Sequence, residues 1–151
     1  MKKNKRSVAR PILALVIIII IIAVAGILVW KFYPKNSEVG KPVYAPKGQL
    51  TPQFPKELIL DTTVAVNNSY AINYSPTLNQ YTAEYDSSNT VKALFADYQS
   101  YLSKNGWTIT STLTTRPMFD ALNATKGTEQ LQVVVSTRDK GSHIIITVVV
   151  K

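Results

Sequence analysis

The side chains that could carry out chemistry are few in this chain. Its 151 residues include a single histidine, His143, and no cysteine. This composition excludes cysteine nucleophiles and metal sites built from several His or Cys ligands. No Gly-x-Ser-x-Gly motif is present to place a nucleophilic serine for His143. We therefore predict no catalytic residue, no metal ligand and no cofactor, and expect that the protein is not an enzyme.

Two carboxylates, Glu84 and Asp86, are spaced so that they share one face of a strand. Such a pair can bind a cation or work as an acid and a base. No loop rich in oxygen ligands accompanies it, so we interpret the pair as part of a solvated sheet face. His143 begins an apolar segment, and we interpret it as a structural or edge histidine.

Four tyrosines form the remaining candidate ligand surface. They are Tyr70, Tyr74, Tyr81 and Tyr85, which fall on the same parity of two segments that are expected to pair. An exposed aromatic row can bind a glycan or another envelope polymer, whereas a buried row would be the core face beneath a helix. The sequence favours the core face, with the ligand surface as the alternative.

One helix is needed to cover that face, and an apolar stripe predicts it. The stripe consists of Val91, Leu94, Phe95, Tyr98 and Leu102, at helical spacing. Ser88 and Asn89 are candidate N-caps, and Asn105-Gly106 is a stop signal. Trp107 follows Gly106 and begins a strand, so we expect its ring to pack on Tyr98 and Leu102 in the last turn.

About five strands are expected around the helix. Apolar and polar residues alternate, or β-branched residues cluster, in residues 70–74, 80–86, 107–114, 131–136 and 143–150. The last segment is apolar on both faces, as is typical of a central strand. The predicted fold class is α+β, an antiparallel sheet with one helix packed on one face, preceded by an N-terminal transmembrane helix.

The transmembrane helix is predicted from residues 11–30, twenty residues without a charge that follow five Lys and Arg side chains. A helix of that length spans about 30 Å of hydrocarbon. Ala23-Val24-Ala25 keeps a cleaved signal peptide open as the alternative. The basic N-terminal flank places the N-terminus in the cytoplasm and the rest outside, in a single-pass protein of the cell membrane.

Composition divides the chain into four regions. They are a basic tail over residues 1–10, a signal-anchor helix over 11–33 that contacts the lipid bilayer, a Pro-rich linker over 34–54 and an extracytoplasmic domain over 55–151. The whole chain has a formal charge of +8, but residues 55–151 hold eight basic and eight acidic side chains. A neutral domain lacks the footprint for phosphate, so we expect no nucleic-acid partner.

The segment from Tyr98 to Trp107 has the pattern Y-x-x-x-L-x-x-x-G-W, and Pro55-Lys56-Glu57-Leu58 precedes it. This pattern resembles small extracytoplasmic domains of uncharacterised envelope proteins in bacteria and archaea. The resemblance spans about residues 54–150. It implies an anchored domain and assigns no functional residue.

These observations predict a membrane-tethered, non-enzymatic binding or accessory domain of the cell envelope, with an envelope protein or a glycan as partner. One alternative is a pilin-like subunit of a surface filament, because a short basic leader precedes the apolar segment. Against it, Pro34 interrupts the helix early. The other alternative is a secreted domain, if the apolar segment is cleaved.

Overall fold

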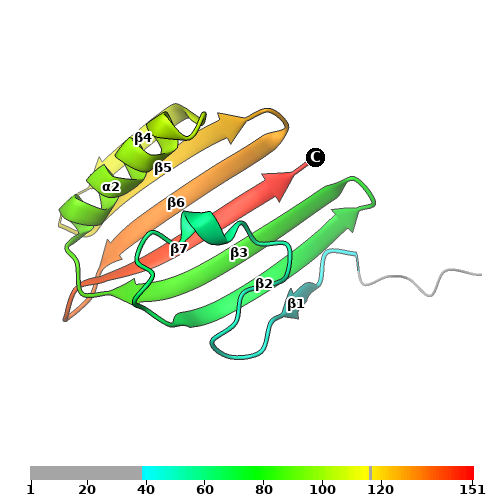
Figure 1. Cartoon of the computed structure of the whole chain (residues 1–151), viewed down its shortest axis with the longest axis horizontal. Helices are drawn as coiled ribbons and strands as arrows, with labels where there is room; N and C mark the ends of the chain where they lie inside the picture. Colours follow the sequence, from blue (N-terminus) through cyan, green and yellow to red (C-terminus); the bar gives the residue numbers. More distant parts are fainter. Residues whose placement is uncertain (1–38, 116) are drawn as a thin grey trace, which may run out of the picture. The chain divides into compact units, whose positions relative to one another are not determined.

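Nine elements are found in residues 39–115 and 117–151, the part of the chain that the computed structural model describes (Figure 1). In order they are β1 (Pro42–Tyr44), the short 3-10 helix η1 (Lys56–Leu58), β2 (Val66–Ser75), β3 (Leu78–Ser87), α2 (Val91–Lys104), β4 (Thr108–Thr115), β5 (Phe119–Lys126), β6 (Glu129–Thr137) and β7 (Ser142–Val150). Each strand is joined to its sheet neighbours in antiparallel register.

The described strands form one seven-stranded sheet in the order β1-β2-β3-β7-β6-β5-β4. The most apolar strand, β7, lies in the middle, as its sequence predicts. Its residues Ile144, Ile146 and Val148 are fully buried on one face, and the residues between them are half-buried. A strand with neighbours on both sides needs side chains that pack on both faces, and β-branched residues meet that need.

The predicted fold class is wrong in two respects. The described residues contain seven strands instead of about five, because β1 and β5 lack a strong alternating pattern. The core face of β5 offers only Leu122 and Ala124 as apolar residues, with the buried Asp120 beside them. The predicted transmembrane helix over residues 11–33 lies outside the described residues. Within the described part, no helix is long and apolar enough to cross a bilayer, so the membrane element has no structural support.

The structure also places part of the expected linker, residues 34–54, inside the folded unit. Residues 42–44 form β1 and pair with β2, with Tyr44 opposite Tyr70. Thr51 and Phe54 are buried, and the backbone N–H of Thr51 donates to the Ser69 hydroxyl over 3.0 Å. The prolines of this segment therefore shape a covering loop as well as a spacer.

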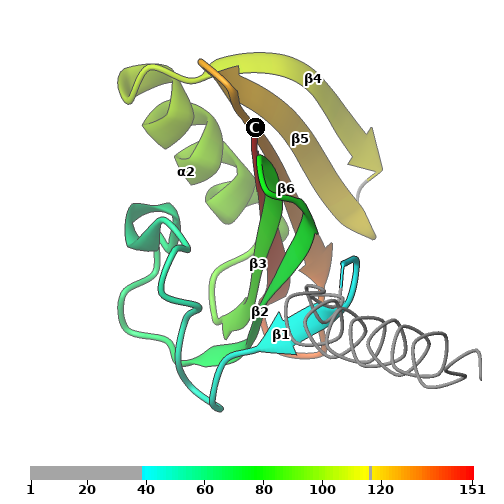
Figure 2. The same ribbon diagram turned by 90° about the vertical axis from the view of Figure 1, so that its right-hand side faces the viewer.

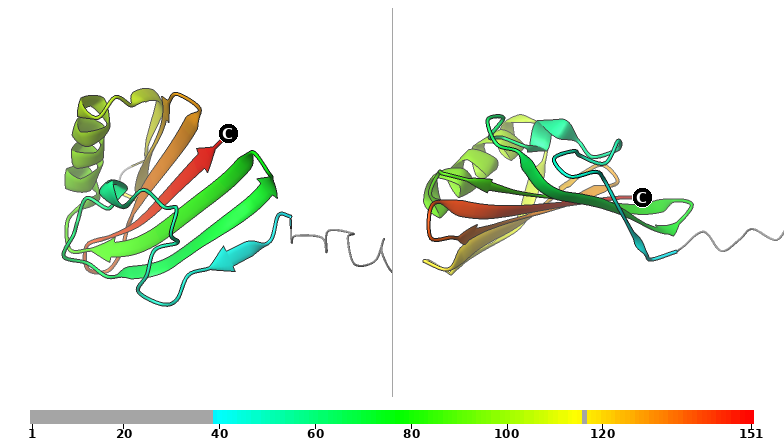
Figure 3. Two further views of the ribbon diagram at one scale, coloured as in Figure 1. Left: turned by 45° about the vertical axis from the view of Figure 1, so that its right-hand side comes forward. Right: turned by 90° about the horizontal axis from the view of Figure 1, so that it is seen from below.

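One face of the sheet is covered by α2 and by the segment that contains η1 (Figures 2 and 3). All five residues of the predicted apolar stripe are buried against the sheet. The cap is Thr90, whose side chain accepts from the Ala93 N–H, in place of the expected Ser88 or Asn89. At the other end Gly106 has φ +80°, and the N–H of Trp107 bonds to the Leu102 carbonyl at 3.1 Å.

A buried chain of hydrogen bonds joins three elements of this layer. The Tyr85 hydroxyl on β3 lies 2.7 Å from the Tyr98 hydroxyl on α2. Tyr98 in turn donates to the carbonyl oxygen of Leu58, at the end of η1, over 2.9 Å. Because that oxygen can only accept, Tyr85 is the donor to Tyr98. Burial raises the pKa of both tyrosines, so both remain neutral donors at physiological pH.

The Trp107 ring closes the same layer beyond the end of α2. Its exposed fraction is 8%, and it belongs to the core cluster that contains Tyr98 and Leu102. The Lys126 ammonium lies 5.9 Å from the centre of the ring. The indole therefore packs inward on the core and carries a cation on its outer side.

Replacement of Tyr98 by Phe should destabilise the protein by about 1–3 kcal/mol, because the Leu58 carbonyl and the Tyr85 hydroxyl would both lose their partner. The matched change Tyr85→Phe should cost less, since Tyr98 still donates to Leu58. Urea unfolding of the two variants measures the difference. If both variants were as stable as the wild type, the buried chain of hydrogen bonds would contribute nothing to the free energy of unfolding.

Replacement of Trp107 by Ala should cost about 3–5 kcal/mol, as is usual for a buried aromatic side chain. Denaturant melts followed by circular dichroism give the loss. The control is Lys126→Ala, which removes the cation but keeps the ring, and should cost below about 1 kcal/mol. A loss of that small size for Trp107→Ala would mean that the ring does not support the core.

Candidate functional site

The face of the sheet opposite α2 is not covered by any other element of the described chain (Figure 2). We call it the outer face. Side chains alternate between the two faces along each strand. On β6, for example, Leu131 and Val133 are buried on the core face, whereas Gln130 and Gln132 are exposed on the outer face. The outer face is therefore where a ligand could reach the folded sheet.

One row of residues crosses the outer face from edge to edge. Strand pairing places Ser111, Asn123, Gln132, Thr147, Thr82, Tyr70 and Tyr44 directly opposite one another, one from each described strand. We call these residues the polar row. Each carries a neutral hydroxyl or amide, so the row can both donate and accept hydrogen bonds without a formal charge. Thr82 is only 1% exposed, so the members on either side of it form the accessible surface.

Hydrogen bonds along the polar row fix its side chains. The Asn123 amide donates to the Ser111 hydroxyl over 2.9 Å, and the Gln132 amide donates to the Asn123 side-chain oxygen over 3.3 Å. Further along, the hydroxyls of Thr147 and Thr82 lie 3.3 Å apart. A bulge in β4 between Ile109 and Ser111 brings Ser111 into this register. These bonds restrict the side chains of Ser111, Asn123, Gln132, Thr147 and Thr82 to a defined arrangement.

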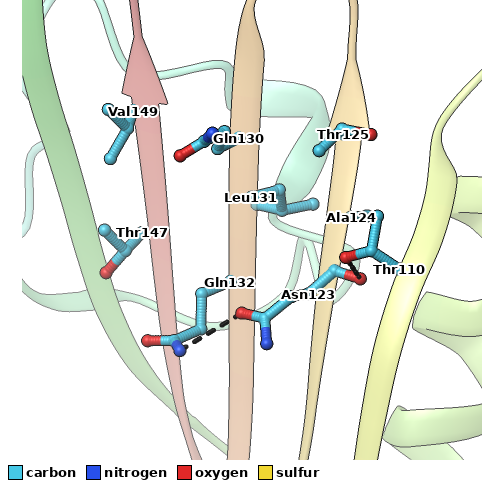
Figure 4. A pocket seen from close by; sticks show the side chains of 9 residues that line it. All are labelled: Thr110, Asn123, Ala124, Thr125, Gln130, Leu131, Gln132, Thr147 and Val149. Atoms are coloured by element: carbon cyan, nitrogen blue, oxygen red, sulfur yellow. Dashed lines mark hydrogen bonds between the residues drawn. The ribbon is translucent and has the colours of Figure 1, made fainter.

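A groove of about 400 Å³ follows the row over β5, β6 and β7, with Thr110 of β4 at its edge (Figure 4). Residues from three consecutive registers line it, with Thr110 at the bulge of β4: Thr110, Asn123, Ala124, Thr125, Gln130, Leu131, Gln132, Thr147 and Val149. None of them is charged. On β7, the short side chains of Thr147 and Val149 lie opposite the longer Gln132 and Gln130 of β6.

The four candidate tyrosines are divided between the two faces. Tyr85 is fully buried on the core face, and Tyr81 packs against the core beside it. Tyr70 and Tyr74 lie on the outer face, and Tyr74 is 43% exposed. The division follows from the register, in which Tyr70 pairs with Thr82 and Tyr81 pairs with Ala71. A shift of one residue in pairing moves a side chain to the opposite face.

The exposed tyrosines meet a partner that the sequence analysis did not consider. Tyr44 on β1 is 60% exposed, and its ring centre lies 5.4 Å from that of Tyr70. The Tyr74 hydroxyl donates to the Gln80 side chain over 3.3 Å, and the Gln80 amide donates to Thr82. Hydrogen bonds thus connect Tyr74 with Thr82 and, through Thr82, with Thr147.

Glu84, Asp86 and His143 meet on the outer face near the end of β3 and the start of β7. The His143 Nδ1 atom lies 2.7 Å from Asp86 Oδ1, and Nε2 lies 3.9 Å from Glu84 Oε2. Arg138 bonds to the other oxygen of Asp86. Among the described residues, no group of three or more His, Cys, Asp or Glu side chains is arranged to hold a metal. The cluster is therefore an ion-paired surface of the sheet.

The pKa of Asp86 is lowered to about 2. Partial burial raises the pKa, but hydrogen bonds from His143, Arg138 and Asn67 outweigh that effect. The pKa of Asp61, in a smaller hollow beside α2, is lowered by its hydrogen bonds with Thr63 and Ser87. The oxygens of Asp61 bind its own loop and the end of β3, so its role is structural.

Of the polar row, sequence reasoning named only Tyr70, together with Tyr74 beside it, and missed the other six members. No motif marks Gln132, and Asn123 only begins the glycosylation sequon Asn123-Ala124-Thr125, which does not indicate a ligand groove. The signal that could have found them is pairing: a predicted register would have aligned uncharged polar residues across neighbouring strands.

Comparison with protein families gives one match. Residues 67–141 match the model of a START domain-like family. The match covers 75 of the 151 residues, from β2 to the turn before β7. The comparison with curated proteins gives no match, and the comparison with solved structures gives none either.

The match includes α2 and five of the strands that carry the polar row, but neither β1 nor β7. It therefore supports an α+β domain over the middle of the chain. It says nothing about membrane anchoring or about the helix-to-strand pattern from Tyr98 to Trp107.

Acid should weaken the fold through Asp86. Its folded pKa of about 2 lies below the unfolded value of about 3.9. The ionised carboxylate therefore stabilises the fold above about pH 4, and this contribution is lost as the pH falls toward 2. In Asp86→Asn the free energy of unfolding, measured by urea titration, should fall less over that interval. Asp139→Asn, an exposed control, should follow the wild type, and an unchanged slope in Asp86→Asn would contradict the assignment.

Proposed function

We propose that this protein is a non-enzymatic binding or accessory domain whose outer sheet face holds a neutral, hydroxyl-rich ligand, a glycan. The observation that carries the proposal is the polar row, in which amides and hydroxyls are ordered by mutual hydrogen bonds over a groove without charge. Location at the cell envelope and an envelope-protein partner stay predictions of the sequence alone.

The chemistry of the groove favours a glycan over other ligand classes. Sugar hydroxyls donate and accept, and neutral amides and hydroxyls match both roles. A phosphate or carboxylate ligand would require cationic side chains, and none lines the groove. Apolar ligands would leave Asn123, Gln130 and Gln132 without their water partners, which is costly.

The histidine cluster offers little support for catalysis. Covalent catalysis requires a nucleophile within hydrogen-bond distance of its base. The Ser136 hydroxyl, on the neighbouring strand, donates to the backbone carbonyl of His143 over 3.3 Å. The ring of His143 is directed to Asp86 and Glu84 instead. This arrangement favours a hydrogen bond between His143 and Asp86 that joins β3 and β7 at the end of the outer face.

Titration of the ¹⁵N-labelled protein with neutral hexasaccharides of glucose, mannose or N-acetylglucosamine tests the proposal. At least one should shift the side-chain amide signals of Asn123 and Gln132 and leave those of α2 unchanged. Asn123→Ala should weaken binding about three- to tenfold, the effect of one hydrogen bond. Gln99→Ala on α2 is the matched control. The proposal is overturned if none of the three hexasaccharides shifts any signal at about 10 mM. It is also overturned if the shifted signals belong only to α2.

A further inference from the structure

We infer that the ligand is an extended, uncharged polysaccharide chain that lies across the strands along the polar row. This inference rests on the proposed function and adds the size, direction and charge of the ligand. A single sugar would need only the amide end of the row. The row continues beyond that end over the other described strands, with accessible members on all of them except β3, where Thr82 is buried.

The length of the row is the first argument. Its seven members lie on seven adjacent strands, which gives six spacings. Neighbouring strands are about 4.8 Å apart, so the row extends over roughly 29 Å. Hydrogen bonds join five of its seven members in two runs, Ser111–Asn123–Gln132 and Thr147–Thr82. From Thr82 the bonds leave the row and continue through Gln80 to Tyr74, which lies beside its aromatic end. Gln132 pairs directly with Thr147, where the two runs meet.

The difference between the two ends is the second argument. At one end Asn123 and Gln132 present amides, which suit the hydroxyl edges of sugar rings. At the other end Tyr44, Tyr70 and Tyr74 present aromatic rings, and Tyr44 is 60% exposed. Aromatic faces pack against the apolar C–H faces of sugars and bring little entropy cost. Only a chain of several sugars can use both ends at once.

The position of the charged side chains is the third argument. The carboxylates Glu84 and Asp86 lie on the same outer face of β3 as Thr82, two and four residues further along. They would repel an acidic polymer whose chain follows the row, whereas a neutral polymer meets no such barrier. The balanced charge of residues 55–151 gives no long-range attraction for a polyanion either.

The experiment measures dissociation constants of the full-length protein for glucose, mannose or N-acetylglucosamine oligomers of two to six units, by the same amide titration. Affinity should rise with chain length, by about tenfold or more between the disaccharide and the hexasaccharide. Tyr44→Ala should weaken binding of the hexasaccharide severalfold and leave the affinity for the disaccharide unchanged. Tyr44→Phe, which keeps the ring, should bind like the wild type.

Each of four other outcomes would overturn a particular part of the inference. A disaccharide that binds as tightly as the hexasaccharide overturns the extended chain but leaves the proposed function standing. Preference for an acidic hexasaccharide, hexagalacturonate, overturns the uncharged polymer. If the free protein sediments as a dimer and Tyr44→Ala sediments as a monomer, a second copy covers the row and the inference is overturned. Absence of binding to every oligomer overturns both proposals.

Discussion

The fold depends on a short chain of buried hydrogen bonds from Tyr85 through Tyr98 to the Leu58 carbonyl. It ties the sheet, the helix and the loop before β2 into one layer at a point where water is excluded. Buried hydroxyls without partners would cost more than the bonds themselves contribute, so the arrangement tolerates few alternatives. It thereby fixes which face of the sheet is closed, and leaves the opposite face open.

An open sheet face in a small domain ordinarily carries charged side chains that keep it soluble. Here the charged groups on the face gather at one end, around Asp86 and His143, and the polar row between Ser111 and Tyr44 is neutral. Amides and hydroxyls that bond to one another across strands lose less entropy on binding than free side chains would. The same row therefore contributes to sheet cohesion and presents hydrogen-bonding groups that are already ordered, which is what the proposed function requires.

Prediction from the sequence succeeded where a pattern lies within one segment. The stripe from Val91 to Leu102 gives the helix and its buried face, and the residues after His143 give a central strand. It failed for β5, where Leu122 and Ala124 provide too few apolar residues to mark a strand. It also placed β1 in a linker, because a strand of three residues is too short to show an alternating pattern.

The sequence alone determined which side chains are available for chemistry: one histidine, no cysteine and a C-terminal region without net charge. Tertiary structure decided which side chains share a face. Tyr70 and Tyr81 have the same local pattern, yet the pairing of Tyr70 with Thr82 sends them to opposite faces. Register is set by contacts between segments far apart in the chain, and a step of one residue reverses every side chain. The polar row exists only because six such registers agree, and no single segment contains that information.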